Sequence, residues 1–180
     1  ASIFKESLDE ALEPDTIPGH PVHTFKLENE AIEKLISKEI KPLLDTLKKA
    51  SPEEEKGISL QILEKVNLLM DIDKHYSRKE NLLFPYLEKN GITAPPKVMW
   101  GVDDEIREEL KQVKALLREY INENKEDVLA KTESALNRVQ EMVFKEEKIL
   151  FPMAMERLTE DEWYEIYNQS DEIGYCLVEP

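Results

Sequence analysis

The sequence HYSRKENLLFPYLEK, residues 75–89, decides the fold because it recurs 67 residues later as MVFKEEKILFPMAME, residues 142–156. The two copies align without a gap, and each carries a basic residue, a glutamate and the triplet Leu-Phe-Pro at matching places. They differ at the first position, where one copy has His75 and the other has Met142. The repeat indicates that the two halves of the chain are built alike.

Composition limits the class of protein and of partner. A chain of 180 residues forms one domain, or one domain with short appendages. Its formal net charge is −15, and the acidic residues are spread along the whole chain. Nucleic acids and anionic membranes bind to basic surfaces, so we expect neither of them as a partner.

The cysteine content and the N-terminal sequence indicate the cellular compartment in which the protein is expected. Cys176 is the only cysteine, which excludes an internal disulfide and favours a reducing environment. No apolar run approaches the ~20 residues that a membrane helix needs. The N-terminus also lacks the basic segment and apolar core of a signal peptide. The sequence therefore predicts a cytoplasmic protein.

Long stretches with helical periodicity and few glycines predict an all-α protein. Ser51, Pro52 and Glu54 form a strong helix-start pattern, and Asn90-Gly91 is a stop signal. Four long helices are predicted, at 25–49, 51–89, 98–122 and 125–158. Long helices with short connections are typical of an up-down-up-down four-helix bundle.

Short segments flank this predicted bundle. The stretch ASIFKESLDEALEP at the N-terminus predicts a short amphipathic helix whose first residues are expected to be missing from this sequence. A proline-rich loop follows it. At the other end, Thr159 and Glu162 predict the start of a short last helix. We divide the chain into an N-terminal flank, a bundle and a C-terminal flank that leads toward a following domain: 1–24, 25–158 and 159–180.

Several polar side chains fall on the predicted inner faces of the helices. A helix turns 100° per residue, so apolar positions three or four apart mark its inner face. In the second helix this stripe passes through Leu68 and Ile72, and in the fourth it ends at Ile149. The same phases predict inward positions for Asn29, His75, Lys79, Asp103, Arg107 and Glu146. Glu80 and Glu147 are predicted to lie to the side, on the surface. Isolated buried charges cost several kcal/mol each, so the inward charges must pair with one another or bind something.

The motifs resemble those of the hemerythrin-like (HHE cation-binding) four-helix bundles. The resemblance rests on the two repeats together with GHPVHTFKLEN (19–29) and VMWGVDDEIR (98–107), and it covers roughly residues 18–178. It is closest to an uncharacterised prokaryotic branch in which such a bundle is joined to a PAS sensor domain. The resemblance therefore implies an up-down-up-down bundle and a PAS or other signalling domain as a partner.

In hemerythrins the bundle holds two iron atoms, ligated mostly by histidine. At the matching positions this chain retains His75 and Glu146. Other residues stand where the remaining ligands of the family would be: Asn29, Lys79, Asp103, Arg107 and Met142. One interpretation is a salt-bridge network in which Lys79 and Arg107 neutralise Asp103 and Glu146. Another is a mononuclear iron, manganese or zinc site of His75, Asp103 and Glu146. A third is a small ligand or haem inside the bundle.

The motif HPVH places His20 and His23 in a loop before the first long helix. At this spacing the two imidazoles can converge on one side of a helical turn and bind a cation, or haem iron. The alternative is that they make local hydrogen bonds that fix the loop. The chain contains no other histidine except His75, so an imidazole-rich site must draw on these three.

The sequence contains no phosphate-binding loop and no nucleophile–base pair. We therefore expect a non-catalytic sensory or regulatory module without a bound cofactor, serving as an input domain to a PAS domain and able to form a homodimer. The alternative is a metal-binding protein with one or two irons, which binds dioxygen or nitric oxide or acts as a redox enzyme.

Overall fold

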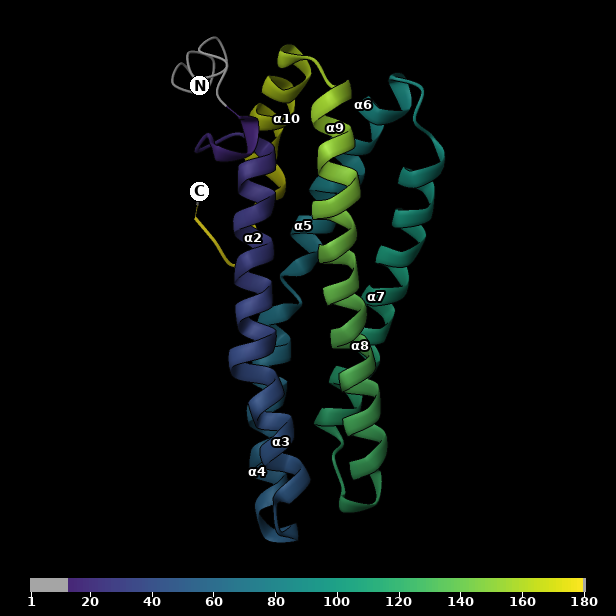
Figure 1. Cartoon of the computed structure of the whole chain (residues 1–180). Coiled ribbons are helices and arrows are strands. Elements are labelled where there is room, and N and C mark those ends of the chain that lie inside the picture. The colour runs from purple at the N-terminus through teal and green to yellow at the C-terminus, as the bar shows by residue number, and fades with distance from the viewer. Residues whose placement is uncertain (1–12, 180) are drawn as a thin grey trace.

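The structure is a computed structural model that describes residues 13–179. Within that range the chain forms helices and no strand. Four long helical rods run alternately up and down (Figure 1). The predicted fold class, an all-α hemerythrin-like helical bundle, is confirmed. The N-terminal helix predicted before residue 13 lies outside the described residues.

Each rod except the third is built from consecutive helical pieces. The first contains α2 (Pro21–Leu35), η2 (Ile36–Ile40) and α3 (Lys41–Lys49). The second contains α4 (Pro52–Leu69), α5 (Ile72–Arg78), η3 (Lys79–Leu83) and α6 (Phe84–Lys89). The third is α7 (Ala94–Arg118). The fourth contains α8 (Lys125–Lys145), η5 (Glu146–Leu150) and α9 (Phe151–Arg157). Contacts of α3 with α4, α4 with α7, α7 with α8 and α3 with α8 close the ring.

The segments η2, η3 and η5 are π-helical turns, and each ends two residues before a proline of the next helix. These prolines are Pro42, Pro85 and Pro152. Proline has no N–H and its ring clashes with the carbonyl of the preceding turn, so an α-helix cannot pass through it unchanged. In each case the residue before the proline bonds five residues back, as Phe84 N–H does to the Lys79 carbonyl. The widened turn accommodates the ring and keeps the rod continuous.

Breaks in the helical phase explain two wrong predictions of the inner face. Ile149 was expected inside, but it lies within η5 and is 55% exposed, because the extra residue of the π turn shifts the helical phase. Leu68 was also expected inside and is 46% exposed, whereas Leu69 is buried. Here the rod is interrupted at Met70 and Asp71, so the phase of α5 does not extend back into α4.

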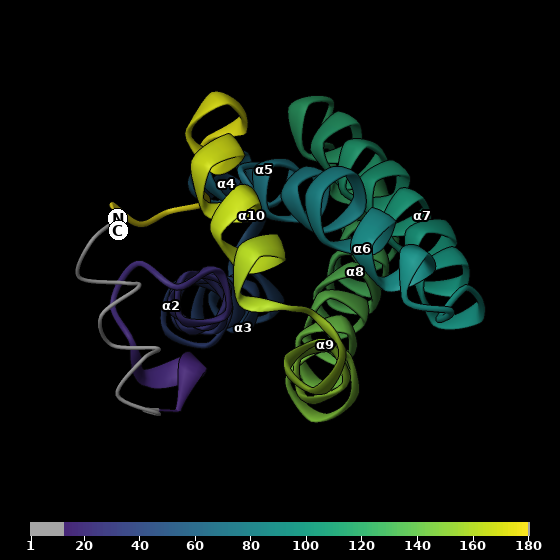
Figure 2. The ribbon, with the colours of Figure 1, turned by 90° about the horizontal axis from the view of Figure 1, so that it is seen from above.

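The last helix of the described residues, α10 (Glu160–Ile173), lies across one end of the bundle (Figure 2). It contacts α2, α5 and η3. Arg78, in α5, and Glu80, in η3, are both buried. Glu80 was predicted to be a surface residue, and that prediction is wrong because its carboxylate pairs with the guanidinium of Arg107, in α7.

The start of α10 is fixed by a capping box. The Thr159 hydroxyl accepts from the Glu162 N–H, and the Glu162 carboxylate accepts from the Thr159 N–H. Replacing Thr159 by alanine removes one half of this pair, so we expect a loss of about 1 kcal/mol in unfolding free energy. Urea denaturation of the two proteins measures the difference. Thr159→Ser is the control, because serine keeps the hydroxyl and should restore most of the loss.

Within residues 13–179 no helix combines the length and the apolar character that crossing a bilayer requires.

Candidate functional site

The centre of the bundle contains a cluster of charged and polar side chains contributed by all four rods. We call it the interior network, and its members are Glu28, Asn29, His75, Arg78, Lys79, Asp103 and Glu146. Each of them is at most 1% exposed. Three members are acidic and three are basic or can become so, which is the balance that burial of charge requires.

His75 lies between two carboxylates. Its Nδ1 is 3.0 Å from Glu28 Oε1 and its Nε2 is 2.8 Å from Glu146 Oε1. An ionised carboxylate only accepts hydrogen bonds, so both ring nitrogens donate and the ring is an imidazolium. Burial alone would lower the pKa of His75, but the charges of Glu146 and Glu28 outweigh it and raise that pKa to about 9.

Lys79 supplies the second central cation. Its Nζ donates to Asp103 Oδ1 at 2.9 Å and to Glu146 Oε2 at 2.7 Å. The ammonium also lies 4.5 Å from the centroid of the Tyr76 ring, a cation–π contact. Asn29 Nδ2 donates to Glu146 Oε1 at 3.0 Å. Glu146 thus accepts from three side chains of two other rods and is the hub of the network.

The two acids that share Lys79 differ in their ease of ionisation. Burial opposes the ionisation of Glu146, but His75 and Lys79 outweigh it and lower its pKa to about 2. At Asp103 burial prevails over the attraction of Lys79, and the nearby Glu80 and Glu146 add to it, so its pKa rises to about 8. Asp103 is therefore the member whose charge changes closest to neutral pH.

Arg78 connects the network to the segment after α10. Its Nη1 donates to both oxygens of Glu28, at 2.7 and 2.6 Å. Its guanidinium is stacked between two rings, with its Cζ 4.6 Å from the centroid of Phe25 and 4.8 Å from that of Tyr175. Sequence reasoning missed both Arg78 and Glu28. Arg78 is covered by α2 and by the segment after α10, and such tertiary contacts give no periodic signal in its own helix. Glu28, in contrast, is adjacent to the predicted Asn29.

Arg107 was predicted to neutralise Asp103 and Glu146, and this prediction is wrong. Its guanidinium binds both oxygens of Glu80, at 2.8 and 2.9 Å, and also Asp73 at 2.7 Å. Its side chain is 18% exposed, at the rim of the interior network. The reason is that Lys79 already occupies Asp103, while η3 presents the next residue, Glu80, to α7.

His20 and His23 lie at the start of α2, outside the interior network. The Nδ1 of His20 accepts from the Val22 N–H at 3.0 Å and so caps the helix. Burial lowers the pKa of His20 to about 3, so its ring is neutral. The Nδ1 of His23 lies 3.0 Å from the carbonyl oxygen of Asp15, to which it donates. In the structure these nitrogens make the local hydrogen bonds of the alternative interpretation.

The residues of the interior network do not fit a bound metal pair. A metal ligand needs a free lone pair, and both nitrogens of His75 are turned to carboxylates. The Nζ of Lys79 lies between Asp103 and Glu146, where it repels a cation and cannot coordinate one. Across residues 13–179, no three His, Cys, Asp or Glu side chains converge in a way that could hold a metal ion.

Comparison with known families gives one match. The model of the hemerythrin HHE cation-binding domain matches residues 20–154, which is most of the chain. None of the curated proteins compared with the chain matches it. The matched region includes all seven members of the interior network, both Leu-Phe-Pro triplets and the four rods up to residue 154 of α9. On this match the chain belongs to the hemerythrin HHE cation-binding domain family.

Proposed function

We propose that this protein is a non-catalytic regulatory module in which a network of side-chain charges has taken the place of the family's metal. The observation that carries the proposal is the position of Lys79. Its ammonium lies within hydrogen-bonding distance of two buried carboxylates and so supplies the positive charge that a bound cation would supply. The imidazolium of His75 supplies a second such charge.

We further propose that the module is an input domain for a PAS or other signalling domain. The motif resemblance to PAS-linked bundles supports this, and so does a network whose charge balance can change at Asp103. If the network is only structural, replacing Lys79 and Glu146 together will change stability and leave the output of a PAS-containing protein unaltered.

The metal-free state has a direct test. Protein purified without a chelator should contain far less than one iron, manganese or zinc ion per chain by elemental analysis. His75→Ala should not change that content, and His23→Ala is the control for ions held outside the network. About one metal per chain, lost in His75→Ala and kept in His23→Ala, would overturn the proposal in favour of the metal-binding alternative.

A further inference from the structure

The chain after α10 is tied to the interior network by its backbone. Gly174 ends α10 with φ at 95°, a conformation that glycine adopts readily. The N–H of Cys176 then donates to Glu28 Oε2 at 2.5 Å. The N–H of Leu177 donates to Asp71 Oδ2 at 2.9 Å. Glu28 therefore bonds at the same time to the chain after α10, to His75 and to Arg78.

The same segment seals one side of the network. The Tyr175 ring covers the guanidinium of Arg78, and Cys176 is completely buried. Glu28 and Arg78 are 0% and 1% exposed. Movement of this segment alone would admit water to Glu28, and the four rods would not have to move.

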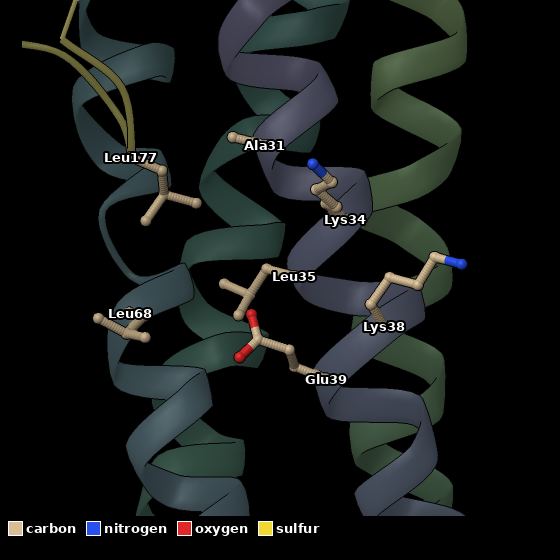
Figure 3. Close-up of a pocket in the computed structure, with 7 residues that line it drawn as sticks. All are labelled: Ala31, Lys34, Leu35, Lys38, Glu39, Leu68 and Leu177. Carbon is tan, nitrogen blue, oxygen red and sulfur yellow. The ribbon is translucent and has the colours of Figure 1, made fainter.

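Leu177 shows that this segment is held under strain. Its φ is 60°, in the left-handed region that side chains disfavour. Such a conformation persists only where the surrounding contacts impose it. Its side chain reaches the edge of a groove of about 390 Å³ between α2 and α4, next to Ala31 and above Leu35 and Leu68 (Figure 3). Packing of the Leu177 side chain against the core and the two backbone bonds hold the strained residue in place.

We propose that residues 174–177 form a latch that the interior network keeps closed through Glu28, so that a change in the network opens the latch. Opening would relax Leu177 and expose Glu28 and Arg78. His75 does not bond to the latch itself, so its influence on the latch must pass through Glu28. This inference rests on the proposed metal-free network and adds the route by which that network acts on the chain after α10.

The single cysteine makes the latch measurable. Cys176 is buried in the closed state, so its labelling by 4,4′-dithiodipyridine under native conditions reports opening. Glu28→Gln and His75→Gln should each accelerate labelling roughly ten- to hundred-fold, the effect expected from weakening a charge-assisted hydrogen bond. Asp71→Asn weakens the second anchor without touching the network and should accelerate labelling by a smaller factor.

Glu55→Gln is the matched control. Glu55 is also buried and accepts from Tyr120, Asn122 and Lys125, but it lies in the first turn of α4, at the far end of the bundle. The Glu55→Gln substitution should leave the labelling rate of Cys176 unchanged. The accelerated rates should also depend little on urea, because local opening exposes little surface.

Unchanged labelling in His75→Gln, or acceleration in Glu55→Gln equal to that in Glu28→Gln, would overturn the latch. Labelling that follows global unfolding in urea would overturn it as well. Metal analysis of the same samples keeps the two proposals separate, since a bound metal would refute the metal-free network whatever the labelling rate.

Discussion

Replacing Lys79 by methionine should lower the free energy of unfolding by about 3–5 kcal/mol, the cost of removing one partner from a buried ion pair. Methionine keeps the length of the stem and removes only the charge. Asp103 and Glu146 would then lie in the bundle without the ammonium that bonds to both of them. The loss should shrink in acid, because Glu146 is easier to protonate without Lys79 and protonation removes its charge.

Urea denaturation at neutral pH measures this loss. Lys131→Met is the control, because Lys131 forms an exposed pair with Asp127, and such pairs contribute about 0.5 kcal/mol or less. If Lys79→Met costs as little as the control, the carboxylates of Asp103 and Glu146 are compensated by another group. The charge-network account of the interior would then be wrong.

Stability should fall as the pH rises from about 6.5 to about 9, because the folded protein holds a proton on His75. A pKa raised by folding stabilises the protein fully below the unfolded value, and this stabilisation is lost as the pH rises through the folded value. The rise from 6.5 to about 9 corresponds to roughly 3 kcal/mol, since one pKa unit is worth about 1.4 kcal/mol. The raised pKa of Asp103 acts in the same direction, at lower pH.

Two measurements check this dependence. Urea unfolding at a series of pH values gives the loss of stability, and NMR of the imidazole ring should place the titration of His75 near pH 9. His75→Gln removes the titrating ring, so the decline between pH 6.5 and 9 should become much smaller. A ring that titrates near 6.5 in the folded protein would mean that His75 is not held between two carboxylates.

Much of the bundle could be predicted from the sequence because its signals are local. Helix starts and stops depend on a few neighbouring residues, and each of the four predicted long helices begins or ends near its predicted position. Five of the six polar side chains predicted to face inward are buried together, namely Asn29, His75, Lys79, Asp103 and Glu146. An unbroken helical period was a sufficient guide for these positions, since each lies close to the stripe used to set the phase.

Residues beyond a break in the helical period could not be predicted in this way. Ile149 lies inside a π turn, and Leu68 lies before the interruption at 70–71, so extrapolated phases fail for both. Arg78 is buried against α2 and the Tyr175 ring, and Glu80 is buried against Arg107 of α7. These tertiary contacts leave no mark on their own helix. The role of Glu28 required knowledge of two distant partners, His75 and Cys176, whose approach depends on the assembled fold.

The three π turns also mean that the two sides of a rod are not in the phase that a regular α-helix would give them. Each turn contains one residue more than an α-helical turn, so it offsets the residues after it by about 100° relative to an unbroken α-helical count. In η3 and η5 this offset begins at Lys79 and Glu146. A rod of the same sequence wound as a regular α-helix through either turn would present different side chains to the interior. The prolines that follow these turns therefore help to decide which residues face the bundle axis.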